Sequence, residues 1–276
     1  MHKLYPLAFL RPNHSRGLDS RSRPQDNMHK REANEAMTDV TRLRAMLAGK
    51  RRVVFFGGAG VSTESGIPDF RGTDGLYHQQ WAYPPETILS HDFFWEKTAE
   101  FYRFYRQKML FPNASPNAAH RELAKMEAEG ILSAVITQNI DGLHQAAGSR
   151  RVIELHGSVH RNFCTRCKKL FTMEEILHSE GVPHCPCGGI IKPDVVLYGE
   201  PLDPQVTQAA QEAIDRADLL LIGGTSLSVY PAAWYVADYP GPIVMLNRAP
   251  TAMDRRASLL LTAPIGETLG QLMGTL

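Results

Sequence analysis

Short apolar runs alternate with segments of helical periodicity along most of the chain. The runs are rich in Val, Ile and Leu, and they predict strands at these positions: 52–56, 134–137, 152–155, 195–198, 219–222 and 243–246. Apolar residues spaced by three or four positions predict helices around Leu43 and at 118–129, 204–216 and 230–237. Strands that alternate with helices in this way indicate an α/β protein with a Rossmann-like, doubly wound parallel sheet.

Two insertions interrupt this alternation. Residues 77–111 are aromatic and helix-prone, and residues 158–190 contain all four cysteines. We expect the insertions to build a smaller zinc-ribbon and helical domain. The larger part of a catalytic domain at 37–276 would then comprise these stretches: 40–76, 112–157 and 191–276. Residues 1–36 are polar and lack periodicity, which predicts a flexible tail and leaves open a targeting segment or a start assigned too far upstream.

Composition narrows the classes of function. The 276 residues are 43% hydrophobic, which is enough for a sizeable core, and the formal net charge is +1. A chain without a basic field is not expected to bind nucleic acid directly. No apolar run approaches the roughly 20 residues that cross a bilayer, so we expect no membrane partner. The clustered cysteines argue against a secreted disulfide scaffold and favour a reducing compartment, the cytoplasm.

A glycine-rich loop follows the first predicted strand. Gly58, Ala59 and Gly60 come where backbone amides at a helix start could approach a pyrophosphate. The usual third glycine is replaced by Thr63, so the loop alone fits a plain turn about as well as a dinucleotide site. The Gly- and Pro-rich loop that carries Asp69, Phe70 and Arg71 favours the dinucleotide site, because such loops seldom serve packing alone.

Polar residues follow two other predicted strands. Gln138, Asn139 and Asp141 come after the strand at 134–137, and His156 comes after the strand at 152–155. Carboxyl ends of parallel strands meet at the edge where such sheets bind ligands. A histidine there can act as a general base near neutral pH, although most histidines in a chain are simply packed in corners. The neighbouring polar residues favour the catalytic interpretation for His156.

The four cysteines form two short-range pairs. Cys164 and Cys167 have two residues between them, and Cys185 and Cys187 have one. This spacing is close to that of a zinc ribbon, in which four thiolates close the coordination shell. We therefore expect one structural Zn²⁺ without a catalytic role. His184 is a minor alternative ligand, and buried free thiols are the alternative without metal.

Several of these motifs, taken in order, resemble the sirtuins, a family of NAD-dependent protein-lysine deacylases. The resemblance covers roughly residues 40 to 270, and the similar segments are these: 58–72, 137–141, 155–157, the cysteine pairs, 193–200, 224–226 and 246–247. It is closest to bacterial members with short chains. One departure is the single residue between Cys185 and Cys187, where the family often has two or more.

The resemblance implies roles for individual residues. His156 would be the base, with Asn139 and Asp141 in the catalytic group. NAD, consumed as a co-substrate, would contact these residues: Gly58, Ala59, Gly60, Asp69, Phe70, Arg71, Tyr77, Gln138, Asn139, Ile140, Asp141, Gly224, Thr225, Ser226 and Asn247. The partners would be acetylated protein lysines, whose peptide adds to the strand at 195–198 while Val195 and Leu197 line the acyl channel. The products would be free lysine, nicotinamide and O-acyl-ADP-ribose, which makes the enzyme a transferase.

The resemblance also implies an acyl preference, and two other functions compete with deacylation. Relatives that prefer succinyl groups carry Tyr-x-x-Arg, whereas Tyr105 stands at the arginine position here, so we expect acetyl or other uncharged acyl groups. The stripe Phe93, Phe94, Phe101 and Tyr105 is expected to be helix core.

Protein mono-ADP-ribosyl transfer from the same NAD site is the alternative activity. A binding module without turnover is a third possibility, against which His156 argues.

Overall fold

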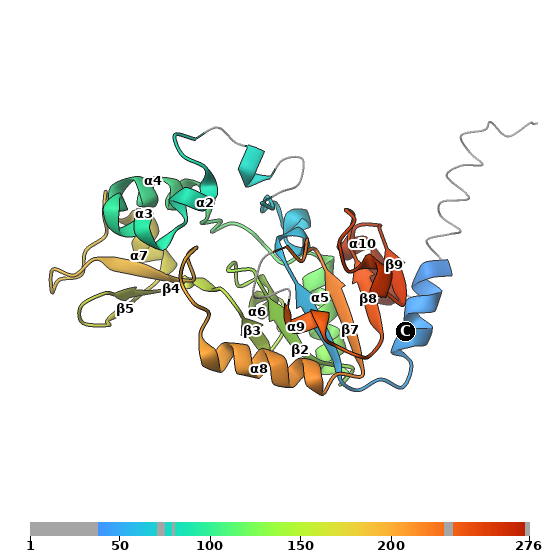
Figure 1. Ribbon diagram of the computed structural model, residues 1–276. Helices are drawn as coiled ribbons and strands as arrows, with labels where there is room; N and C mark the ends of the chain where they lie inside the picture. The colour runs from blue at the N-terminus through green and yellow to red at the C-terminus, as the bar shows by residue number, and fades with distance from the viewer. Residues whose placement is uncertain (1–37, 71–74, 79–80, 229–233, 274–276) are drawn as a thin grey trace, which may run out of the picture. The chain divides into compact units, whose positions relative to one another are not determined.

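The computed structural model describes residues 38–70, 75–78, 81–228 and 234–273 (Figure 1). The predicted tail at 1–36, Arg71 and the start of the predicted helix at 230–237 lie outside the described residues. Within them, six parallel strands form one sheet in the order β3-β2-β1-β7-β8-β9. Their bounds are β1 Val53–Gly57, β2 Leu132–Thr137, β3 Val152–Glu154, β7 Leu219–Gly223, β8 Ile243–Leu246 and β9 Leu259–Leu261. The predicted α/β fold with a parallel sheet is confirmed.

The strand order reverses beside β1. The chain starts in the middle of the sheet, moves outward through β2 and β3, and returns to the other side of β1 with β7. The strands that follow β1 and β7 therefore lie on opposite sides of this pair, which makes its carboxyl end a switch point, where open parallel sheets bind ligands. Every residue of β1 and β7 is buried, as expected for strands covered on both faces.

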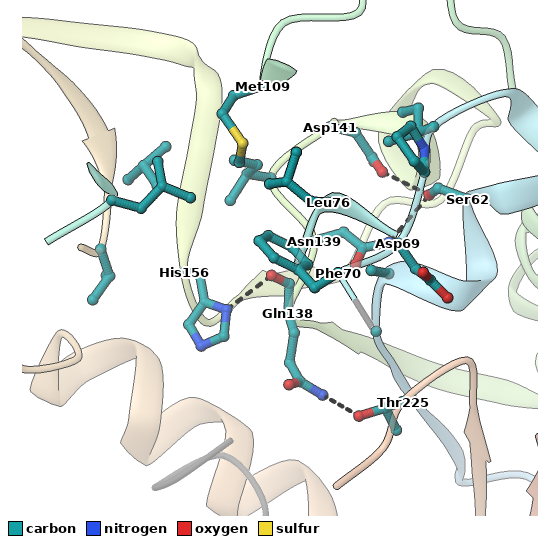
Figure 2. Close-up of a pocket in the computed structure, with 18 of the residues that line it drawn as sticks. Ser62, Asp69, Phe70, Leu76, Met109, Gln138, Asn139, Asp141, His156 and Thr225 are labelled. Atoms are coloured by element: carbon teal, nitrogen blue, oxygen red, sulfur yellow. Dashed lines mark hydrogen bonds between the residues drawn. The ribbon is translucent and has the colours of Figure 1, made fainter. Parts of the chain in front are cut away.

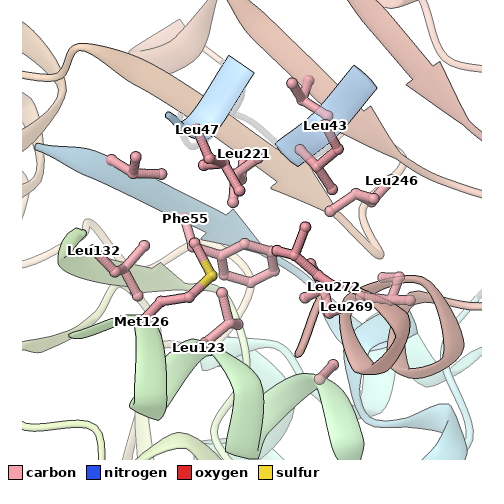
Figure 3. Close-up of a cluster of buried hydrophobic side chains, with 14 of the residues drawn as sticks. Leu43, Leu47, Phe55, Leu123, Met126, Leu132, Leu221, Leu246, Leu269 and Leu272 are labelled. Carbon is pink, nitrogen blue, oxygen red and sulfur yellow. The ribbon is translucent and has the colours of Figure 1, made fainter. Parts of the chain in front are cut away.

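Helices cover both faces of the sheet. On one face, residues 38–47, α5 (Ala118–Ala128) and α10 (Ile265–Met273) pack around Phe55, which is fully buried at the centre of the cluster in Figure 3. On the other face lie α8 (Pro204–Asp215) and α9 (Trp234–Ala237). This two-sided cover is the doubly wound arrangement. No helix among the described residues is long and apolar enough to cross a membrane.

The two longest of these helices begin at side chains that cap them. Asn117 Oδ1 accepts the amides of Ala119 and His120 at the start of α5, and Asp203 Oδ1 accepts two amides at the start of α8. Such caps satisfy amides that lack partners within the helix. After α5, Gly130 has a φ of 72°, the left-handed conformation that glycine adopts without strain.

The two insertions share a separate hydrophobic core. The helices α2 (Pro85–Ile88), α3 (His91–Glu96), α4 (Thr98–Lys108) and α7 (Met173–His178) accompany a three-stranded antiparallel sheet in the order β5-β4-β6. Its strands are β4 Gly157–Cys164, β5 Leu170–Phe171 and β6 Ile191–Val195. Phe93, Phe94, Phe101 and Tyr105 are buried in this core, so the prediction that the aromatic stripe is core is confirmed. The remaining short elements are α6 Leu143–Ala146 and the 3₁₀ turns η1 Ala59–Val61, η2 Thr63–Ser65, η3 Leu76–His78 and η4 Asp254–Arg256.

Two sequence-based expectations for the main sheet are wrong, and one strand was not predicted. The run at 195–198 is no strand of it, because β6 ends at Val195 and pairs antiparallel with β4. The glycine loop leads into the 3₁₀ turns η1 and η2 and not into an α-helix. The edge strand β9 was not predicted, since three residues are too few to show a pattern.

Candidate functional site

A cavity of about 320 Å³ opens at the carboxyl ends of β1, β2 and β7. Figure 2 shows part of its lining, with the ring of Phe70 drawn between His156 and Asp141. The structure brings together on its walls these residues singled out in the sequence: Gly58, Ala59, Gly60, Asp69, Phe70, Gln138, Asn139, Ile140, Asp141, His156, Val195, Leu197, Gly224, Thr225 and Ser226. They come from segments far apart in the chain, so the switch point gathers them as expected.

Two predicted cofactor residues do not line the cavity. The hydroxyl of Tyr77 lies 2.7 Å from that of Tyr198, and its ring meets Phe70 edge-on. Asn247 lies behind the wall, where Oδ1 accepts from Thr225 N at 3.1 Å and Nδ2 donates to Thr225 O at 2.8 Å. Asn247 therefore holds the loop after β7 in place. Arg71 is outside the described residues.

The loops after β1 and β7 are in backbone contact. The amides of Gly58 and Gly60 donate to the carbonyls of Gly223 and Gly224, at 3.2 and 2.8 Å. A Cβ on Gly60 would lie 2.8 Å from the Cα of Gly224, so only glycine fits there. Because both glycine amides are used inside the protein, the Ala59 N–H is the loop amide that remains available to a phosphate.

A chain of hydrogen bonds connects the glycine loop to the end of β2. Ser62 Oγ donates to Asp141 Oδ2 at 2.6 Å and accepts from Asn139 Nδ2 at 3.1 Å (Figure 2). Ser62 was not among the predicted site residues, although it directly follows the glycine loop in the sequence. It is 1% exposed. A buried hydroxyl that bridges two polar side chains fixes their orientation toward the cavity.

His156 is held in one tautomer. Its Nδ1 lies 2.9 Å from the carbonyl oxygen of Gln138. A carbonyl only accepts, so Nδ1 carries the proton and Nε2 keeps a lone pair. Burial lowers the pKa of His156, while the bond to Gln138 opposes that shift. The imidazole is therefore neutral at pH 7 and its Nε2 is suited to accept a proton.

Apolar residues form the other end of the cavity. Leu76, Leu89, Met109 and Phe111 line it beside Val195 and Leu197. None of the first four was predicted as a site residue, because nothing in an apolar side chain distinguishes a cavity wall from a core. Tyr105 is fully buried and does not line the cavity, and Lys108 is the only lysine or arginine among the described lining residues.

Two buried histidines lie behind the polar wall. The rings of His120 and His144 are 4.7 Å apart, and both are almost completely buried. His120 Nδ1 accepts from Asn117 N, and the Asn117 side chain donates to Val61 O in the glycine loop. Burial lowers the pKa of His120 from 6.5 to about 4 and that of His144 from 6.5 to about 3. Both are therefore neutral well below physiological pH.

The four cysteines meet in one cluster. Their sulfur atoms all lie within 4.8 Å of one another, with 3.4 Å between Cys164 and Cys187 and 3.6 Å between Cys167 and Cys185. A zinc ion bound tetrahedrally at about 2.3 Å holds its sulfurs about 3.8 Å apart. The backbone amides of Arg166 and Cys167 also point at Cys164 Sγ. The cluster therefore fits a closed four-thiolate zinc site, and His184 is not part of it.

The fold and the cavity place the protein among the enzymes that bind a dinucleotide at the switch point of a parallel sheet. A family model described as Sir2 family matches residues 58–231, which is more than half of the chain. The protein belongs to the Sir2 family.

Relatives and solved structures agree with this assignment. An NAD-dependent protein deacetylase of Clostridium acetobutylicum is 52% identical over 235 residues, 83% of this chain and 96% of the relative. One of Cutibacterium acnes is 53% identical over 219 residues, 78% and 90% of the two chains. A solved Sir2 complex with a deacetylated p53 peptide and 3'-O-acetyl ADP ribose has a TM-score of 0.80 at 39% identity, covering 86% of this chain and 98% of that one. A Sir2 complex with a p53 peptide and NAD⁺ has a TM-score of 0.76 at 40% identity, covering 85% and 97%.

The cysteine cluster predicts one zinc ion per chain, measurable by elemental analysis of the purified protein. A strong chelator should remove the ion and loosen the β4–β5–β6 sheet, because the metal holds the two cysteine pairs together. Circular dichroism would follow the loss and its reversal on adding zinc. Cys185→Ser should lower the zinc content, whereas His184→Ala should leave it at one. Equal loss of zinc in both variants would contradict a four-thiolate site.

The buried histidine pair predicts a fall in stability in acid. Between about pH 6.5 and pH 4 the unfolded chain binds protons that folded His120 and His144 do not, so the free energy of unfolding falls as the pH falls. Removing His144 should reduce that fall by on the order of 2 kcal/mol between pH 7.5 and pH 5. Urea unfolding of wild type and His144→Leu at the two pH values measures it.

Two features make this comparison specific. Burial raises the pKa of Glu122 to about 7, which opposes the histidine effect, but that contribution is present in both proteins and cancels. His178→Leu removes an exposed histidine of α7 and serves as the control. If His144→Leu and His178→Leu show the same pH dependence as wild type, the buried pair does not cause it.

Proposed function

We propose that the protein removes acetyl groups from protein lysines with NAD as co-substrate, giving nicotinamide and an O-acetyl-ADP-ribose. The observation that carries this proposal is the neutral His156, whose Nε2 lone pair lies in the same cavity as the glycine loops and the Asn139–Ser62–Asp141 chain. Family membership and the names of the relatives support it. Transfer of the acetyl group to ADP-ribose would make the enzyme a transferase.

The residues present fit NAD. Ala59 N–H and the loop after β7 would bind the phosphates and the adenosine half, with Gly224, Thr225 and Ser226 in contact and Asn247 behind them. Asn139 and Asp141 would hold the nicotinamide end, because Ser62 already orients both. Phe70 lines the cavity and would shield the reacting ribose from the return of nicotinamide. When bound, NAD supplies an activated bond between ribose and nicotinamide.

His156 would take a proton from a ribose hydroxyl. Its protonated Nδ1 is fixed on Gln138 O, and the Gln138 side chain donates to Thr225 Oγ1 at 3.0 Å. The imidazole therefore cannot turn without breaking a bond to the end of β2. A base that is neutral and pre-oriented needs no rearrangement when the proton moves.

A substrate peptide would pair with the segment 195–200. Most backbone groups there are already used: Val196 N donates to His156 O, Tyr198 N donates to Leu89 O, and Tyr198 O accepts from His91 N. Val196 and Gly199 line the cavity, and among the described residues neither the C=O of Val196 nor the N–H of Gly199 has a protein partner. One acceptor and one donor at the cavity rim are what an added extended chain requires.

The acyl group would lie against the apolar end of the cavity. Val195 and Leu197 are 8% and 3% exposed there, beside Leu76 and Met109. A carboxylate placed among these side chains would lose its hydration, and the described lining residues include no arginine to pair with it. The cavity therefore supports acetyl and other uncharged acyl groups. Four thiols that bind zinc also favour a reducing compartment such as the cytoplasm.

Replacing the base should abolish turnover. In His156→Ala, release of nicotinamide from NAD and an acetyl-lysine peptide should fall by at least about a hundredfold, which is the range for losing a general base. His178→Ala, at an exposed position, should keep wild-type activity. Retention of activity in His156→Ala would refute the assignment. With labelled NAD, label in a small acetylated product supports deacetylation, and label on protein would indicate ADP-ribosyl transfer instead.

The apolar cavity predicts the order of acyl preference. Acetyl and propionyl peptides of one sequence should be deacylated much faster than the succinyl peptide, measured as kcat/KM. Lys108 offers the only cation in the described lining. The variant Lys108→Met therefore tests whether any residual succinyl activity depends on that cation. It should leave the acetyl rate unchanged, because an acetyl group carries no charge. A succinyl rate equal to the acetyl rate in wild type would refute the preference.

A further inference from the structure

A largely buried ion pair lies beside segment 195–200, and its acidic member, Glu200, also lines the cavity. Lys192, in β6, is 8% exposed, and its Nζ lies 3.1 Å from Glu200 Oε2 and 3.1 Å from Val195 O. Glu200 Oε1 lies 3.1 Å from His91 Nδ1, at the start of α3. Two side chains, Lys192 of β6 and His91 of the aromatic insertion, thus converge on one carboxylate, which none of the roles described above uses.

Glu200 fixes the turn at the end of this segment. Its own N–H donates to Leu197 O at 2.9 Å, and its Oε2 accepts from Leu197 N at 2.9 Å. The turn has Gly199 at its third position with a φ of 88°, a conformation suited to glycine. One residue therefore holds both the N–H and the C=O of Leu197.

The hydrogen bond to Leu197 N also sets the direction of the carbonyl before it. Val196 C=O and Leu197 N–H belong to one planar trans peptide group and point in opposite directions. With the N–H turned toward the Glu200 carboxylate, the carbonyl must point away from that carboxylate, and Val196 lines the cavity. The direction of Gly199 N–H is fixed in the same way. Gly199 N–H shares its peptide plane with Tyr198 C=O, and that carbonyl accepts a hydrogen bond from His91 N.

We propose that Glu200, anchored by Lys192 and His91, is a positioning residue that presents Val196 C=O and Gly199 N–H to the acyl-lysine peptide. The inference rests on the proposed function, since it assumes that a peptide pairs with these two groups. It assigns Glu200 no contact with the reacting atoms. Its effect is to hold two peptide planes in the orientation that a bound chain requires, so that binding does not have to order them.

The charge state of the carboxylate agrees with this role. Burial alone would raise the pKa of Glu200, but the bonds from Leu197 N, His91 and Lys192 outweigh burial and hold the pKa below its ordinary value. Glu200 is therefore ionised at neutral pH. An ionised acceptor forms a stronger hydrogen bond with Leu197 N than a neutral one would.

Steady-state kinetics of the full-length protein with NAD and an acetyl-lysine peptide test the inference. In Glu200→Ala the peptide plane is free to turn, and KM for the peptide should rise by about tenfold, the effect of losing one or two neutral hydrogen bonds. KM for NAD should stay within about twofold, because the glycine loops and the Asn139–Ser62–Asp141 chain are untouched. Glu200→Gln keeps an oxygen for Leu197 N and should recover part of the peptide affinity.

Two further variants separate positioning from general stability. Asp218→Asn is the matched control: Asp218 also accepts from a cation, Arg52, and from a backbone amide, that of Arg51, but it lies at the amino end of β7, away from the cavity. It should leave both KM values unchanged. If Glu200→Ala fails to fold, Lys192→Met/Glu200→Gln removes both charges and should still raise KM for the peptide selectively.

Each outcome either supports or overturns the positioning role of Glu200. A selective rise in KM for the peptide, partly restored by Gln, supports positioning. Unchanged constants in the Glu200 variants, or equal rises for peptide and NAD, overturn it while the proposed function stands. A wild-type protein that releases no nicotinamide with any acetyl peptide overturns the proposed function and this inference together.

Discussion

The close approach of the loops after β1 and β7 is the constraint on which the site depends. Gly58 and Gly60 lie against Gly223 and Gly224, and a Cβ on Gly224 would come within 2.4 Å of Val61 N. Backbone atoms therefore form the floor of the cavity, and the loop after β1 donates two hydrogen bonds to carbonyls at the end of β7 there. With larger residues the loops would separate, and Gln138 at the end of β2 would no longer reach Thr225 across the strand between them.

The polar residues above this floor are oriented from behind. Asn117 caps α5 and at the same time donates to Val61 O, so the helix on one face of the sheet holds the glycine loop. Ser62 fixes Asn139 and Asp141, and Gln138 O fixes His156. Each of these side chains already makes a hydrogen bond within the protein before any ligand binds. Pre-orientation of this kind reduces the ordering that binding and catalysis require.

Much of this arrangement is predictable from the sequence, for physical reasons. Buried parallel strands are apolar throughout and end in polar residues, so the edge with Gln138, Asn139, Asp141 and His156 shows in the pattern. Cysteine pairs at short spacing have few uses other than metal. By contrast, the run at 195–198 is extended and apolar whichever sheet it joins, and only the pairing of β6 with β4 decides that. Ser62 and Met109 could not be distinguished from an ordinary turn and an ordinary core residue, because their roles depend on neighbours distant in sequence.

Recognition through backbone groups has a consequence for selectivity. Nearly every residue of any peptide offers the same N–H and C=O, so a chain held by Val196 and Gly199 is accepted whatever its side chains are. Discrimination must then arise where the modified lysine enters the protein, between the apolar end of the cavity and His156. No arginine is among the described lining residues, so a carboxylate there would lose hydration without compensation, whereas an acetyl group would lose little. If a peptide pairs with Val196 and Gly199 as proposed, the enzyme would distinguish acyl groups more sharply than it distinguishes protein sequences.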